Sequence, residues 1–139
     1  MLNLTNLNNL FILQKKAIRI ICGAGYFDHT APLFKQENIL PLNLLIEYEI
    51  SKFMYDYLNL NLPESFDNTW LQNWEFRGEV SLRNDFDFML PQVKYVYLFD
   101  HPLFKFPKVW NDLDSDLKNI ARRVEFCSQA KKLYIQKIN

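Results

Sequence analysis

The chain has 139 residues, of which 49% are apolar and 16% aromatic. This length suits one domain with its own core, and the composition excludes intrinsic disorder, collagen-like repeats and low-complexity sequence. The 16 basic and 16 acidic residues give a formal net charge of zero, which is unlike that of a strongly basic nucleic-acid-binding protein.

Charge is uneven along the chain, because most acidic residues fall in residues 31–90 and basic residues prevail in residues 91–139. No apolar run reaches the ~18 residues of a membrane span, so we expect no membrane partner. The two distant cysteines, Cys22 and Cys127, predict neither a disulfide framework nor a zinc site. With no secretory signal recognisable at the N-terminus, we expect an intracellular protein of the nucleus or cytoplasm.

The first predicted helix covers residues 5–21. Its spacing places one apolar stripe opposite a basic side, and the glycine-containing segment Cys22-Gly23-Ala24-Gly25 is expected to end the helix. The stripe consists of Leu10, Leu13, Ala17, Ile20 and Ile21, and the basic side of Lys15, Lys16 and Arg19. Residues 26–41 are a predicted connector with a short helix over residues 32–36, capped by Thr30.

The second long helix is expected to open at Pro41 and to reach about Asn61, since proline fits the first helical turn. It is apolar on most of its circumference, which indicates burial in this domain or against a partner. Residues 62–93 favour loop and irregular pieces. The alternating aromatic residues 95–99 predict a strand, and residues 104–110 a second extended segment broken by Pro107.

A last helical region is predicted over residues 116–137, with Asp114 or Ser115 as its cap and a break near Arg123. The sequence therefore predicts a mainly α fold. We expect one small helical domain over residues 1–139 with a minor extended or β element, and Trp110 as a core anchor.

Three patterns resemble catalytic or metal sites only in part. Residues 112–116 begin as a calcium loop, but Leu117 stands where such a loop needs glycine, so a solvated turn is favoured. Cys22, Asp28 and His29 include the residue types of a nucleophilic site, yet a packed cysteine and a loop histidine explain the pattern as well. No paired carboxylates for a two-metal polymerase site and no nucleotide-binding loop are legible. We therefore expect no metal, no cofactor and no enzymatic activity.

Two basic sets remain as candidate nucleic-acid contacts. The first is the trio on the first helix, and the second lies in residues 118–137. Ordinary solvated surface is the alternative reading for both. The candidate nucleic-acid-binding residues are Lys15, Lys16, Arg19, Arg122, Arg123, Lys131 and Lys132.

Several segments, in order, resemble the C-terminal region of non-LTR (LINE-type, jockey-like) retrotransposon reverse transcriptases. Residues 13–21 resemble the family's LQKKAIRII helix, residues 28–34 its H-x-x-PLF turn, and residues 38–42 and 62–66 its hxILxL and LPxxF segments. Residues 108–113 resemble PKIWNxL, and Phe126 with Lys131 and Lys132 the closing FKxxLKxxL. The ordered set covers nearly the whole chain and is more specific than any one motif.

The chain departs from the family pattern in three places. Ser81-Leu82-Arg83 replaces the Y-x-T-R segment, Phe106 stands where the family has glycine, and Leu113-Asp114 replaces its Leu-Pro. These departures hint at a decayed or repurposed copy of this transposable-element protein.

The family are RNA-directed DNA polymerases whose catalytic carboxylates lie upstream of the resembled region. The resemblance thus implies a non-catalytic module that contacts the RNA or DNA backbone, beside the upstream reverse transcriptase core, or a stand-alone remnant of one. A helical protein-interaction module, docking through the apolar second helix, is the alternative, and a remnant with no selected role is a third.

Overall fold

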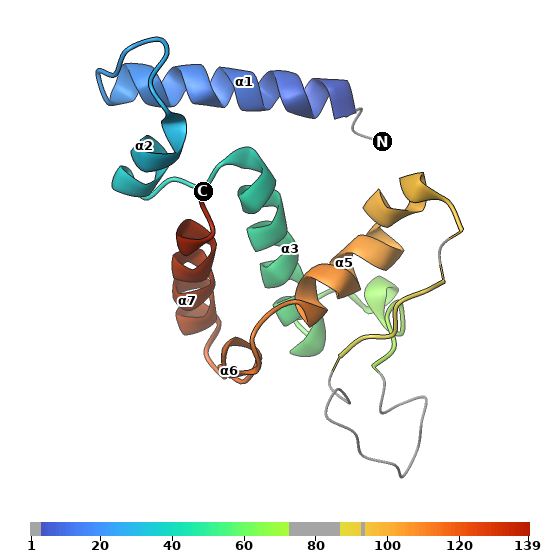
Figure 1. Cartoon of the computed structure of the whole chain (residues 1–139). Coiled ribbons are helices and arrows are strands. Elements are labelled where there is room, and N and C mark those ends of the chain that lie inside the picture. Colours follow the sequence, from blue (N-terminus) through green and yellow to red (C-terminus); the bar gives the residue numbers. More distant parts are fainter. Residues whose placement is uncertain (1–3, 73–86, 93) are drawn as a thin grey trace. The chain divides into compact units, whose positions relative to one another are not determined.

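The computed structural model describes residues 4–72, 87–92 and 94–139, and the fold over these residues is mainly α, as predicted (Figure 1). The α-helices are α1 (Leu4–Ile21), α2 (Thr30–Gln36), α3 (Leu42–Leu58), α5 (Pro102–Asn111), α6 (Ser115–Lys118) and α7 (Arg123–Gln136). Two 3₁₀ helices, η1 (Glu64–Phe66) and η2 (Val96–Asp100), lie between them. Within the described ranges the extended structure amounts to one isolated antiparallel bridge between Gln72 and Phe88.

The chain divides into two compact units. Unit 1 consists of residues 1–48 and 128–139, and unit 2 of residues 49–127. Helices α3 and α7 contribute residues to both units. The single domain expected over residues 1–139 stays a prediction.

Unit 1 is built on a cluster of three buried residues from distant parts of the chain. Ile18 of α1, Phe34 of α2 and Ile138 near the C-terminus pack together, with Cys22 and Leu44 against them. The loop after α1 turns the chain back so that α2 contacts α1 (Figure 1). Burial of these apolar side chains fixes α2 on one side of α1.

Helix α1 ends as predicted, at a glycine. Gly23 has a φ of 61°, in the left-handed region, and its N–H donates to the carbonyl of Ile20. The N–H of Ala24 donates to the carbonyl of Arg19 across the same turn. This pair of hydrogen bonds is a Schellman motif, which satisfies the last helical carbonyls and places a left-handed residue at its centre, where glycine is the least strained choice.

The predicted apolar stripe of α1 is not its packing side. Within the stripe, Leu10 is 49% exposed and Ile20 is 80% exposed, whereas Ile18, outside the stripe, is 2% exposed. Hydrogen bonds of a polar residue, Gln14, determine the packing side instead. The side-chain amide of Gln14 donates to the carbonyl of Leu40 at 2.9 Å and accepts from the N–H of Leu42 at 2.8 Å. These bonds fix the side of Gln14 and Ile18 toward the start of α3.

Gln14→Ala should lower the free energy of unfolding by about 1–3 kcal/mol, because it leaves two partly buried backbone groups without their partner. Urea denaturation followed by circular dichroism measures the change. Gln129→Ala, at an exposed position of α7, is the matched control and should change stability by less than about 0.5 kcal/mol. Equal effects of the two substitutions would contradict a special role for Gln14.

Unit 2 is held by an aromatic cluster. The rings of Trp70 and Phe106 stack with centroids 5.8 Å apart, and the ring of Phe53 meets both edge-on. The Tyr57 hydroxyl donates to the backbone carbonyl of Trp70 at 2.8 Å and accepts from the backbone N–H of Trp70 at 3.1 Å. The chain after α3 is thereby attached to α3 by both packing and hydrogen bonds.

Two predicted extended segments are helical, so these expectations were wrong. The aromatic residues 95–99 fall largely in η2, where Phe99 packs on Phe104 with centroids 4.9 Å apart. Residues 104–110 belong to α5, although Pro107 lies inside it. Capping explains α5, since the imidazole Nδ1 of His101 accepts from the N–H of Leu103 and Pro102 occupies the first turn.

The other predicted helices and irregular segments can be compared with the structure where it describes the residues. Helix α6 begins directly after Asp114, and α7 begins at Arg123 after a break, as expected. The predicted short helix of the connector is α2, but the expected cap at Thr30 was wrong, since α2 begins at Thr30 and His29 is its N-cap residue. Helix α3 ends at Leu58, three residues before the predicted end. The predicted irregular segment 62–93 includes η1, while residues 73–86 and 93 lie outside the described ranges.

Candidate nucleic-acid interface

The basic trio of α1 lies on one side of the helix, as predicted, in unit 1. Lys15 and Arg19 are one helical turn apart, and Lys16 follows on the adjacent side. The ammonium nitrogen of Lys15 lies 4.2 Å from the centroid of the Phe11 ring, a cation–π contact. The Nε of Arg19 donates to the carbonyl of Asp28 at 3.0 Å.

No carboxylate of the described residues lies within ion-pair distance of the trio. Among the described residues, five cations elsewhere have an acidic partner: Lys52 with Glu49, Lys105 with Asp100, Lys108 with Asp112, Lys118 with Asp87, and Arg123 with Asp56. Unpaired cations on one helical side leave a positive local potential that attracts an anion.

The loop after α1 carries two aromatic rings to the trio. The N–H of Asp28 donates to the carbonyl of Gly25 at 3.1 Å, and the Asp28 carboxylate accepts from the N–H of Gly25 at 2.7 Å. This closes a β-turn with Tyr26 and Phe27 at its two central positions. The Arg19 bond to Asp28 ties this turn to α1.

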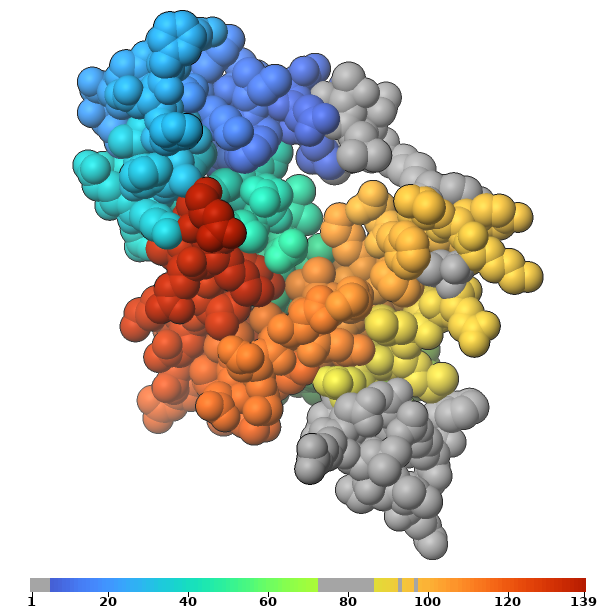
Figure 2. All heavy atoms as spheres, in the orientation of Figure 1, coloured from blue at the N-terminus to red at the C-terminus, as the bar shows by residue number. Residues whose placement is uncertain are grey.

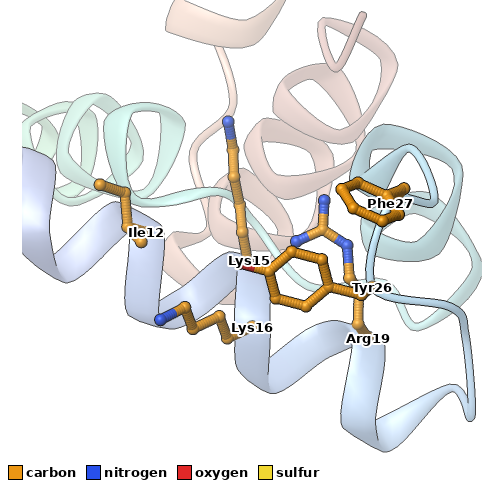
Figure 3. A pocket seen from close by; sticks show the side chains of 6 residues that line it. All are labelled: Ile12, Lys15, Lys16, Arg19, Tyr26 and Phe27. Atoms are coloured by element: carbon orange, nitrogen blue, oxygen red, sulfur yellow. The ribbon is translucent and has the colours of Figure 1, made fainter.

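The two rings are unusually open to solvent, since Tyr26 is 71% and Phe27 90% exposed. They meet edge-on, with centroids 5.0 Å apart. Figure 2 shows α1 and the loop after it at the surface of unit 1. Together with Ile12 and the trio, the rings line an open hollow of about 300 Å³ (Figure 3).

The second basic set is divided between the two units. Arg122 and Arg123 belong to unit 2, whereas Lys131 and Lys132 belong to unit 1. The guanidinium of Arg123 binds Asp56 with both Nε and an Nη, at 2.7 and 2.8 Å. Lys131 is half-buried and Lys132 exposed on α7, and Arg122 is exposed just before it.

The other sequence patterns have structural roles. The Cys22 thiol donates to Oε1 of Glu37 at 3.8 Å, and burial, with Glu37 as a lesser cause, raises the pKa of that thiol. A raised pKa favours the thiol over the nucleophilic thiolate. Asp28 holds the β-turn, and His29 is the N-cap residue of α2. In residues 112–116, Asp112 pairs with Lys108 and Asp114 precedes α6.

Across the described ranges, no three His, Cys, Asp or Glu residues are grouped as metal ligands. In the same part of the chain, no helix has both the length and the apolarity required to cross a bilayer. No protein-family model, no curated protein and no solved structure matches the chain.

Sequence reasoning placed the trio but missed Tyr26 and Phe27, which fell in a segment treated as a connector. The available signal was the pair of consecutive aromatic residues between Gly25 and Asp28, directly after the end of a basic helix. Turn-forming residues on both sides present such rings to solvent instead of to a core.

Proposed function

We propose that the chain is a non-catalytic nucleic-acid-contacting module, which binds the phosphate backbone of RNA or DNA through Lys15, Lys16 and Arg19. One observation carries the proposal: three neighbouring cations on one side of α1 have no acidic partner among the described residues. The order of its sequence motifs supports a C-terminal module of a LINE-type reverse transcriptase, or a stand-alone remnant of one. The upstream core of such an enzyme is its proposed partner, in the nucleus or cytoplasm.

The physical basis is the release of counterions. Each phosphate that a lysine or arginine neutralises frees a condensed cation, so binding weakens as salt rises, with a log–log slope of about 0.7–0.9 per contact. The trio needs no base contacts for this. Lys131, Lys132, Arg122 and Arg123 are proposed as further contacts, although the charge of Arg123 is already paired with Asp56.

A second candidate function is protein interaction, and the exposed apolar stripe of α1 favours it. Leu13 is 59% and Ile21 63% exposed within that stripe. Docking through the second long helix, α3, is less well supported, because part of its apolar surface is already used for packing within the chain. Its buried residues are Ile50, Ser51, Met54 and Tyr55.

Replacing Lys15, Lys16 and Arg19 together by glutamine should weaken RNA and DNA binding about equally. The log–log salt slope should become shallower by about two to three units, the sum of three lost contacts. Helix content should be kept, since glutamine is a good helix former. Fluorescence anisotropy at several salt concentrations measures the slope.

The matched control replaces three ion-paired lysines, Lys52, Lys105 and Lys108, by glutamine. It removes the same formal charge from the chain but leaves the trio intact, so the slope should stay close to that of the unchanged protein. If both triple variants alter the slope equally, binding follows total charge and the proposed surface on α1 is wrong.

A further inference from the structure

We propose that the hollow beside α1 selects single-stranded nucleic acid, by stacking an unpaired base on Phe27 and Tyr26 while the trio holds the adjoining phosphates. This inference rests on the proposed function and adds the strand type and two contact residues to it. It has three supports: the exposure of the rings, the way they are held, and the cations beside them.

The exposure of the rings is the first support. Phe27 is 90% exposed, the largest value among the large exposed apolar side chains of the described residues, and Tyr26, directly before it in the chain, is 71% exposed. Leaving two such rings in water forgoes the stabilisation that their burial would give. They are therefore available to stack against a ligand with a planar ring system.

The backbone that carries the two rings is also held in place. Two hydrogen bonds within the β-turn fix the backbone on either side of them, and Arg19 ties the turn to α1. A Cβ on Gly25 would lie 3.3 Å from the Asp28 carboxylate, so the turn is closely fitted at its first residue. A backbone that is already fixed loses little further conformational freedom when a base stacks on the rings it carries.

The rings and cations share one hollow. In Figure 3 the Tyr26 and Phe27 rings lie beside the side chains of Lys15 and Arg19, with Lys16 and Ile12 completing the rim. Proteins that bind single strands combine a positive groove for the backbone with aromatic side chains for successive bases. A duplex keeps its bases stacked inside, so it can offer the trio only phosphates.

The experiment titrates the full chain with three fluorescent probes: a short oligothymidylate, an abasic strand with the same number of phosphates, and a duplex of the same length. The double variant Tyr26→Ala with Phe27→Ala should lose about 5- to 150-fold in affinity for oligothymidylate, the range of one stacked base. Its affinity for the abasic strand and the duplex, and its salt slope, should match those of the unchanged protein.

The control variant is Phe99→Ala, which removes an exposed ring of unit 2 and should leave all three affinities unchanged. Circular dichroism checks that the double variant folds, as expected for two exposed turn residues.

The two proposals fail in different ways. If the double variant binds oligothymidylate as well as the unchanged protein does, while the trio variant loses salt dependence, stacking is overturned and phosphate contact stands. If the unchanged protein binds none of the probes, both are overturned. If polyglutamate competes with oligothymidylate at equal charge, the hollow recognises acidic protein segments, and the single-strand assignment is overturned.

Discussion

Trp110→Ala is expected to lower the free energy of unfolding by about 3–5 kcal/mol, the usual cost of removing a buried tryptophan. Trp110 is 2% exposed, which confirms its predicted place in the core. Its ring lies 6.0 Å from that of Phe126, and Phe126 in turn stacks on Tyr55 with centroids 4.4 Å apart. The substitution therefore opens a cavity within a continuous row of rings in unit 2.

Urea denaturation followed by circular dichroism measures this loss. Trp110→Phe should cost much less, because the indole N–H has no hydrogen-bond partner among the described residues and phenylalanine keeps most of the ring contact. Phe27→Ala, at an exposed ring, is the control and should change stability by less than about 0.5 kcal/mol. A loss at Trp110 no larger than at Phe27 would show that the tryptophan is not an anchor.

The second large effect is expected at Asn111, the neighbour of Trp110. Its side-chain amide accepts from the N–H of Phe88 and donates to the carbonyl of Phe88, both at 2.8 Å. Phe88 is 1% exposed, so neither backbone group has ready access to water. Asn111→Ala leaves both unpaired and should cost about 2–4 kcal/mol.

Amide hydrogen exchange offers a local measurement of the same effect. The Phe88 N–H should exchange much faster in Asn111→Ala, while Asn119→Ala, at an exposed position after α6, should leave it protected. Slow exchange at Phe88 in both variants would mean that the Asn111 amide does not hold this segment.

Local signals in the sequence were sufficient for most of the helices. Gly23, Pro41 and Asp114 mark helix ends through backbone rules that act within a few residues, and the structure begins or ends helices beside all three. The prediction of extended chain around Pro107 was wrong because it relied on local preferences of proline and alternating aromatic residues. The helix forms there because His101 caps its start and Trp110 is buried.

The packing side of α1 could not be predicted from hydrophobic periodicity. The helix has apolar residues around much of its circumference, and a polar residue, Gln14, determines which side faces α3 by hydrogen bonds to Leu40 and Leu42. An argument from hydrophobic periodicity assigns a polar residue such as glutamine to the exposed side of a helix. The trio was predicted correctly to share one side, whereas the rings of Tyr26 and Phe27 join it through a turn whose geometry periodicity does not report.

Unit 1 is assembled from two stretches that are far apart in the sequence, and this affects the order in which the chain can fold during synthesis. Ile138 packs against Ile18 and Phe34, so this cluster closes a loop that contains the whole of unit 2. Residues 49–127 are continuous and can acquire their contacts as soon as they leave the ribosome. Residues 4–48 can form contacts among themselves earlier, such as Ile18 with Phe34, but their cluster is complete only once Ile138 has been synthesised.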